Sequence, residues 1–225
     1  IKNSKLRGVE SFGMICASDE IGLGELFPSE TEGEILDLSA FDVPAGTSLA
    51  NALDMNDVLL EIDNKSMTNR PDLWGHYGIA REIAALYNLP LAKIEPFRAD
   101  VQSDFKVEIE DPDRCTRYIG VEMSGVAVKP APYKMQNRIW KVGMRPINAL
   151  VDITNYVMLA TGNPTHAFDA DNITDHIVVR HAGEGEKLLL LNDKELEFEI
   201  QSNISQRSET EIYKVTLVLK GKKPE

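Results

Sequence analysis

The sequence lacks the features of secreted, membrane-spanning and metal-binding proteins. It has no apolar run long enough to cross a bilayer and no charged-then-apolar segment at its start that would act as a secretory signal. Its only two cysteines, Cys16 and Cys115, lie far apart and outside any CxxC motif, and its four histidines are scattered. We therefore expect a cytoplasmic protein with reduced cysteines, no membrane partner and no metal site in this stretch.

The chain also lacks an excess of basic residues. Its 24 lysines and arginines face 36 aspartates and glutamates, which gives a formal net charge of −12. Dedicated nucleic-acid binders usually show a basic surface instead. Any contact with RNA must therefore come from a local basic patch.

No internal repeat or low-complexity tract divides the chain. Its 225 residues are 43% hydrophobic and 27% charged, which suits one to three globular units with a sizeable core. The first residue is Ile1, in what reads as the middle of a domain. We therefore expect the chain to be a piece of a longer protein.

The stretch from Arg145 to Asp169 combines a helix pattern with reactive side chains. Its apolar and small residues recur at i, i+3, i+4 and i+7 spacing, which predicts an amphipathic helix. Gly162 suits the position after the helix, and Pro164 prevents its continuation. A tight turn is then expected to present His166. The predicted apolar stripe is Ile147, Leu150, Val151, Thr154, Met158 and Thr161, and the predicted polar face is Asn148, Asp152 and Asn155.

A basic row precedes this stretch. A helix is expected over residues 132–142, because proline is favoured at helix starts. Lys134, Arg138 and Lys141 fall on one side of it, Arg145 continues the row, and no acidic residue interrupts it. In so acidic a chain, this row is the candidate phosphate-facing surface. The alternative is a solvated basic helix face without a ligand.

Alternating and turn patterns predict the remaining elements. Residues 73–87 are expected to form a helix that Asp72 caps and Pro90 ends. Arg70 and Asp72 are expected to form a structural turn, and His76 to be a packing histidine. The predicted fold class is α+β, with mixed or antiparallel sheets, short helices and several modules. Strands are expected within residues 57–63, 106–112, 117–129, 177–182, 187–192 and 211–220, and strand-like glycine-punctuated segments within residues 1–45.

Three segments resemble one protein family, in the order in which the family carries them. Residues 151–169, VDITNYVMLATGNPTHAFD, closely resemble the editing domain of bacterial phenylalanine–tRNA ligase beta subunits. Two other segments resemble the same subunit. They are residues 5–25, KLRGVESFGMICASDEIGLGE, and residues 61–91, EIDNKSMTNRPDLWGHYGIAREIAALYNLPL. The resemblance covers roughly residues 1–196.

The resemblance implies a domain order. Residues 1–45 would be the C-terminal part of an OB-fold tRNA-binding domain, although they are too few to supply its five strands. Residues 46–95 would be a small structural α/β module, and residues 106–198 a partial editing domain. The family's glycine-rich loop, and its acidic residue that reads the tyrosine hydroxyl, have no counterpart after Leu196. The tail, residues 199–225, therefore stays unassigned, and full editing by this chain alone is not expected.

The resemblance also implies an editing pocket. An apolar pocket for phenylalanine rejects tyrosine only about a hundredfold, so a second site that hydrolyses tyrosyl-tRNA(Phe) is physically reasonable. Matched by position, His166 would orient water or the terminal ribose hydroxyls, since imidazoles accept protons near neutral pH. Thr154 would offer a hydroxyl near the ester, and Arg145 would hold the terminal phosphate or flank the pocket. Asn155 and Asp169 are further substrate-binding candidates beside this pocket, and the basic row adds Lys134, Arg138 and Lys141.

Each of the three catalytic candidates has a structural alternative. His166 could cap the turn that leads to Asp169. Thr154 could belong to the core, with its hydroxyl bonded back to the helix. Arg145 could form an ion pair with Asp152 or with Asp169.

For the whole protein, the resemblance implies a ligase subunit that joins phenylalanine to tRNA(Phe) with ATP and magnesium. It would work with an alpha subunit, in a heterotetramer of two alpha and two beta chains. The ATP and magnesium sites are expected outside this stretch, so this chain alone should not aminoacylate. The alternatives are a free-standing tRNA-binding or trans-editing protein and a non-catalytic architectural module.

Overall fold

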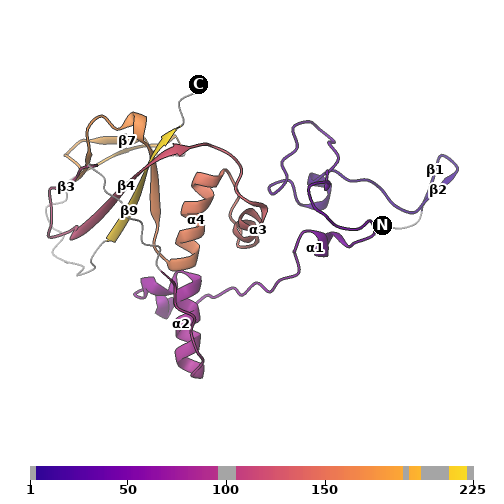
Figure 1. The fold of residues 1–225 in the computed structure, drawn as a ribbon, viewed down its shortest axis with the longest axis horizontal. Coiled ribbons are helices and arrows are strands. Elements are labelled where there is room, and N and C mark those ends of the chain that lie inside the picture. The colour runs from indigo at the N-terminus through magenta and orange to yellow at the C-terminus, as the bar shows by residue number, and fades with distance from the viewer. Residues whose placement is uncertain (1–3, 96–104, 190–192, 199–212, 222–225) are drawn as a thin grey trace. The chain divides into compact units, whose positions relative to one another are not determined.

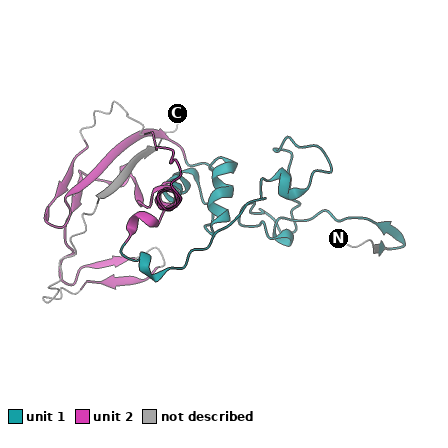
Figure 2. Ribbon diagram, turned by 90° about the horizontal axis from the view of Figure 1, so that it is seen from below, with its two compact units in different colours: residues 1–69, 128–156 teal, residues 70–127, 157–225 magenta. Residues whose placement is uncertain are grey.

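A computed structural model describes residues 4–95, 105–189, 193–198 and 213–221 (Figure 1). The chain divides into two compact units (Figure 2). Unit 1 comprises residues 1–69 and 128–156, and unit 2 comprises residues 70–127 and 157–225. Short helices occur together with small parallel and antiparallel sheets, which confirms the predicted α+β class.

Unit 1 consists mainly of short elements and ordered loops. A two-stranded hairpin opens it, and its turn places both Arg7 and Gly8 at positive φ, as tight hairpin turns require. Leu53 and Ile139 are fully buried, and the ring of Tyr133 contacts the rings of Phe27 and Phe41. The elements are β1 (Ser4–Leu6), β2 (Val9–Ser11), η1 (Asp19–Ile21), α1 (Leu49–Ala52), η2 (Lys65–Met67), α3 (Tyr133–Lys141) and residues 149–156 of α4 (Ala149–Thr161).

Unit 2 contains the described sheets other than the hairpin. Strand β9 lies between β4 and β5 and is parallel to both, so a segment near the C-terminus completes this sheet. Strands β3 and β6 form a parallel pair, and β7 and β8 an antiparallel pair. The elements are η3 (Pro71–Leu73), α2 (His76–Tyr87), β3 (Val107–Ile109), β4 (Arg117–Val126), β5 (Thr165–Asp169), η4 (Ala170–Asn172), β6 (Ile177–Val179), β7 (Lys187–Leu189), β8 (Glu195–Glu197) and β9 (Tyr213–Gly221).

Several predicted elements are confirmed. Helix α3 begins directly after Pro132, which serves as its N-cap. Helix α4 ends before Gly162, which has a φ of 80° and whose backbone N–H donates a hydrogen bond to the Met158 carbonyl, as expected at a helix end. Strands β3, β4, β6, β7 and β9 begin within the ranges that the alternating pattern predicted.

Three local predictions are wrong. Residues 57–63 form no strand in the described part of the chain, because no neighbouring strand pairs with them. His166 lies in strand β5 rather than in a tight turn, because β9 supplies a partner strand. Asp72 does not cap α2, whose N-cap is Gly75, since the Asp72 carboxylate binds arginines instead.

The start of α2 packs tightly against the end of α4. His76 Nδ1 lies 2.8 Å from the Leu159 carbonyl oxygen, one of the last carbonyls of α4, so the exposed His76 caps a helix end. A Cβ added to Gly75 would lie 2.7 Å from the Thr161 carbonyl carbon and closer still to the Gly162 amide nitrogen. Only glycine at position 75 therefore permits this backbone-to-backbone approach.

No helix in the described residues combines the length and apolar character that a bilayer-spanning helix requires. The described part also brings no three His, Cys, Asp or Glu side chains together in a way that would hold a metal ion. Both cysteines are free thiols.

Candidate functional site

The basic row on α3 divides into a structural face and an exposed face. Lys141 Nζ donates to the Asp54 carbonyl at 2.6 Å and to Asp57 Oδ2 at 3.0 Å, and its side chain is only 17% exposed. The hydrogen bond from Lys141 to Asp57 holds the pKa of the Asp57 carboxyl below its ordinary value. Asn137 Nδ2 and Tyr133 Oη also donate to the Leu53 carbonyl, so Lys141 belongs to a face that fixes the end of α1.

Of the predicted basic row, Lys134, Arg138 and Arg145 have exposed side chains. Arg138 donates to the Tyr156 hydroxyl at 2.6 Å, which links α3 to α4 within unit 1. Arg145 does not continue the helical row, because α3 ends at Lys141 and Gly143 then turns the chain at a φ of 82°. The predicted row of four is therefore two exposed helix residues, one structural lysine and one loop arginine.

Arg145 borders a cleft of about 680 Å³ in unit 1. Asp152 also borders it and is only 1% exposed, with Oδ1 accepting the Ile147 amide at 2.9 Å. A carboxylate in the first turn of α4 accepts an otherwise unpaired amide and interacts favourably with the helix dipole, which explains why Asp152 of the predicted polar face is buried. Within the described residues, no ion pair joins Arg145 to Asp152.

Thr154 lies on the buried side of α4. Its side-chain hydroxyl donates to the Val151 carbonyl at 2.7 Å, and the residue is 9% exposed. This is the back-bonded geometry that competes with a role at the ester. Asn155, the next residue, is half-buried.

His166 and Asp169 belong to unit 2, on strand β5. His166 is exposed and lies in register with Thr216 of β9. Because strand side chains alternate between faces, His166 shares a face with Phe168, whereas Asp169 projects from the other face. Asp169 accepts from the Asp171 amide and from Asn172 Nδ2, so it caps η4 and does not orient His166.

Phe168 borders a second cleft, of about 660 Å³, within unit 2. Tyr118 of β4 and residues 172–180, including His176, form the rest of its lining. The arrangement places aromatic side chains beside the face of β5 that carries His166. No sequence pattern identified this cleft, because its walls come from distant segments.

Two histidines without a predicted role bind carboxylates across the β3–β6 pair. His176 Nε2 lies 3.3 Å from Glu108, and His176 Nδ1 lies 2.7 Å from Asp175. His181 Nε2 lies 2.5 Å from Asp111 and is the main cause of the lowered pKa of that carboxyl. The pairs with Glu108 and Asp111 link the β6 segment to the β3 segment, which is a structural role, whereas Asp175 is the sequence neighbour of His176.

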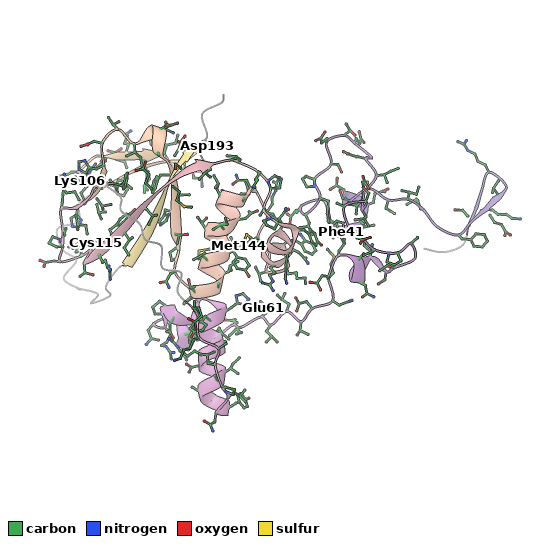
Figure 3. All side chains as sticks on the ribbon, in the orientation of Figure 1. Phe41, Glu61, Lys106, Cys115, Met144 and Asp193 are labelled. Carbon is green, nitrogen blue, oxygen red and sulfur yellow. The ribbon has the colours of Figure 1, made fainter. Side chains whose placement is uncertain are left out.

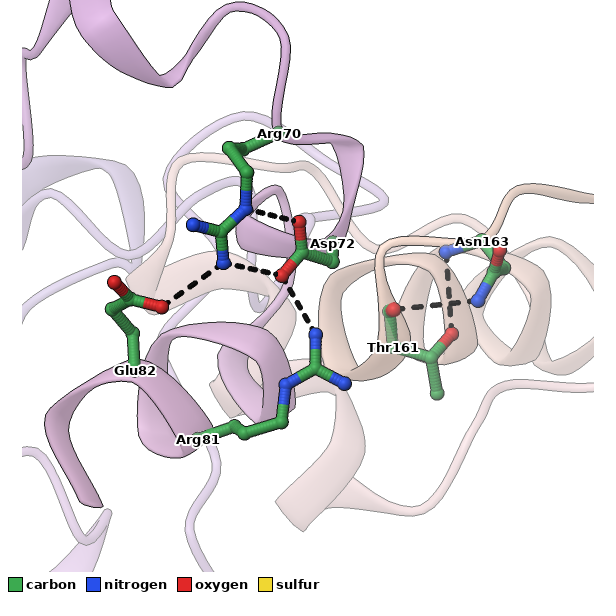
Figure 4. Close-up of polar contacts among 6 residues, drawn as sticks. All are labelled: Arg70, Asp72, Arg81, Glu82, Thr161 and Asn163. Atoms are coloured by element: carbon green, nitrogen blue, oxygen red, sulfur yellow. Dashed lines mark hydrogen bonds and ion pairs between the residues drawn. The ribbon is translucent and has the colours of Figure 1, made fainter. Parts of the chain in front are cut away.

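The Arg70–Asp72 turn is part of a larger ion-pair cluster (Figure 4). Arg70 makes two hydrogen bonds of 2.9 Å to Asp72 and one of 3.0 Å to Glu82, and Arg81 reaches Asp72 at 2.7 Å. The bonds from Arg70 hold the pKa of Asp72 far below its ordinary value of 3.8. The predicted structural turn is confirmed, and it also binds the middle of α2 through Arg81 and Glu82.

Acid is expected to weaken unit 2 through Asp72 and Glu186. The bonds from Arg180 lower the pKa of Glu186 from 4.5 to about 2. A carboxyl with a lowered folded-state pKa adds stability above its ordinary pKa and loses it as pH falls toward the folded value. The melting temperature of wild type should exceed that of Asp72→Asn by a margin that narrows as pH falls from about 6 to about 2.

Thermal unfolding followed by circular dichroism measures this margin. Asp171→Asn is the matched control, because the exposed Asp171 side chain makes no hydrogen bond or ion pair within the described residues. A margin that stayed constant across the acid range would contradict the role given to Asp72.

Comparison with known proteins shows which proteins this chain is similar to. Residues 114–223 match the family model of the B3/4 domain. The phenylalanine–tRNA ligase beta subunit of Fusobacterium nucleatum subsp. nucleatum is 41% identical over 196 residues, an alignment that covers 85% of this chain. The chain is a homologue of phenylalanine–tRNA ligase beta subunits. Within it, residues 114–223 resemble a B3/4 domain.

Two further beta subunits agree with this assignment. That of Anaeromyxobacter dehalogenans is 42% identical over 200 residues, or 87% of the chain, and that of Solibacter usitatus is 43% identical over 192 residues, or 84%. The chain spans about a quarter of these relatives, since each alignment covers 24% of the relative. The B3/4 match includes β9, which lies in the tail that the sequence resemblance left unassigned.

Proposed function

We propose that this chain is part of a phenylalanine–tRNA ligase beta subunit and that it contributes tRNA contacts and post-transfer editing. The observation that carries the proposal is the identity of 41–43% to three proteins of that name over at least 84% of the chain. In this proposal the whole enzyme joins phenylalanine to tRNA(Phe) with ATP, magnesium and an alpha subunit, as two alpha and two beta chains. Those cofactors belong to other parts of the enzyme.

The proposed reaction of this stretch is hydrolysis of the ester that joins tyrosine to the terminal ribose of tRNA(Phe). Water attacks the ester carbonyl, the bond to the ribose oxygen breaks, and that oxygen takes up a proton as tyrosine leaves. His166 is the residue proposed to orient the water or a ribose hydroxyl and to accept a proton. Its exposure on the sheet face supports this role, because a buried or bonded imidazole would not reach a substrate.

The other candidates differ in how well their contacts suit substrate binding. Arg145 borders a cleft and is exposed, which suits a phosphate contact. Lys134 and Arg138 are also exposed and could contact phosphate in the same way. Lys141 is already bonded to Asp54 and Asp57, so its contacts favour a structural role.

Thr154, Asn155 and Asp169 remain candidates of lower rank. Thr154 bonds its own helix and Asp169 caps η4. Thr154 would have to exchange its hydrogen bond to the Val151 carbonyl for one to the substrate.

The same proposal includes three domain assignments. It assigns residues 1–45 to the end of an OB-fold domain, residues 46–95 to a structural module and residues 106–198 to the editing domain.

Deacylation of tyrosyl-tRNA(Phe) tests the proposal, with phenylalanyl-tRNA(Phe) as the matched control. The complete enzyme that contains this chain should release tyrosine selectively. Equal, slow loss of both amino acids from the complete enzyme would overturn the editing assignment. Selective hydrolysis by this chain alone would favour a free-standing trans-editing protein. If this chain alone deacylates tyrosyl-tRNA(Phe) but does not aminoacylate tRNA(Phe), the two activities lie in different parts of the enzyme.

A further inference from the structure

An apolar segment of unit 1, residues 57–63, has the pattern of a strand without a partner strand. Val58, Leu60 and Ile62 alternate with Leu59 and Glu61, so one face of the extended segment is fully apolar. Val58 is 80% exposed, Leu60 73% and Ile62 53%. In Figure 3 the side chains of this segment, with Glu61 labelled, project from an extended trace. A run of exposed apolar side chains of this kind marks an interaction surface.

The backbone of the same segment is also unpaired. Within the described residues, no backbone–backbone hydrogen bond involves residues 58–62, and the Val58 amide bonds only the Asp57 carboxylate. Unpaired amides and carbonyls along an extended, apolar segment are the template on which another strand adds. Lys141 holds one end of the segment in place through Asp57, so the template is anchored to α3.

We infer that residues 57–63 are an edge strand that pairs with a β-strand supplied by the rest of the longer beta-subunit polypeptide. This inference rests on the proposed function. Its partner strand has apolar side chains that cover Val58, Leu60 and Ile62, and basic side chains opposite Glu61 and Asp63. The alignments cover only 24% of the related beta subunits, so such a polypeptide has ample length outside this stretch.

The charge pattern disfavours a second copy of the segment as the partner. An antiparallel pair centred on Leu60 would place Asp57 opposite Asp63, and a parallel in-register pair would place Glu61 beside Glu61. Like charges directly opposite each other destabilise a strand pair. The acidic residues therefore select a strand of different sequence, which a longer polypeptide supplies.

Hydrogen exchange of the amides of residues 58–62 tests the inference in the full-length beta subunit with its alpha partner. Exchange there should be slower than in this chain alone by a factor on the order of 10² or more. Leu60→Asp should lower the melting temperature of the full-length complex and leave that of the isolated chain unchanged. Val128→Asp is the control, because Val128 is 74% exposed and lies after the end of β4, outside the strands of the described residues.

Two results would overturn the inference. One is equally fast exchange in both proteins, and the other is a dimer of the isolated chain that Leu60→Asp dissociates, which would make a second copy the partner. Aminoacylation and deacylation are measured on the same complex. Slow exchange in a complex that lacks both activities would reject the proposed function and support the strand pairing. Normal activities together with fast exchange would support the proposed function and reject the strand pairing.

Discussion

His166→Ala is expected to reduce hydrolysis of tyrosyl-tRNA(Phe) by the complete enzyme about 10²–10⁴-fold, the usual contribution of a positioned acid–base group. The imidazole is exposed on the face of β5 that also carries Phe168. Its loss removes the group proposed to orient water or a ribose hydroxyl, while the backbone pairing of β5 with β9 remains. Charging with phenylalanine should not change, because the proposed aminoacylation site lies elsewhere.

Single-turnover deacylation measures this effect, with His181→Ala as the matched control. His181 is also an exposed histidine of unit 2, but it lies just after β6 and pairs with Asp111, which lies just after β3. An unchanged rate in His166→Ala would remove His166 from the mechanism. A pH profile separates chemistry from folding, since loss of an acid–base group should flatten the acid limb of the rate, whereas loss of stability should lower the rate at every pH.

The helices and several strands were predictable because their signals are local. Pro132 before α3 and Gly162 after α4 act through their own backbone geometry, without reference to distant residues. The Arg70–Asp72 turn was predictable for the same reason, since the two residues lie two positions apart. Their further partner Glu82 was not, because α2 must first form and bring it close.

The errors arise where a partner comes from far along the chain. His166 was expected in a turn, because nothing near it in sequence indicates that β9 will pair with β5. Residues 57–63 have the alternation of a strand, but a ladder needs a second strand, and none in the described residues provides it. Alternation predicts what a segment can bury, not which segment will cover it.

The candidate site shows the same limit for single side chains. Lys141 and Lys134 are equivalent in the sequence row, yet one is bonded to Asp54 and Asp57 and the other is exposed. Asp152 was expected on the polar face of α4, yet it is buried where it satisfies the Ile147 amide. Spacing places a residue on a face of a helix, whereas only the packing of the other elements decides which faces are covered.

Gly78→Ala is expected to destabilise unit 2 by about 1–3 kcal/mol or more, in the range of overpacking substitutions. In an ordinary helix interior the same change would stabilise by about 1 kcal/mol, because alanine has the higher helix propensity. At Gly78 the added Cβ would overlap the Asp72 carbonyl oxygen and crowd the Leu73 amide nitrogen, which is 3.3 Å away. Both obstacles are backbone atoms, so no side-chain rotation relieves them. The steric cost should therefore exceed the gain in propensity.

Urea denaturation measures the free energy of unfolding, and Gly183→Ala is the control. A Cβ at Gly183 would meet only the Glu186 carboxylate oxygen, at an ordinary 3.6 Å, so its effect should stay within about 0.5 kcal/mol. Gly75→Ala should resemble Gly78→Ala, because its Cβ would meet the backbone of Thr161 and Gly162. Stabilisation by Gly78→Ala would mean that α2 does not begin against the η3 turn in solution. Since Asp72 also binds Arg70 and Arg81, the same substitution should weaken that cluster and reduce the acid sensitivity that Asp72 confers.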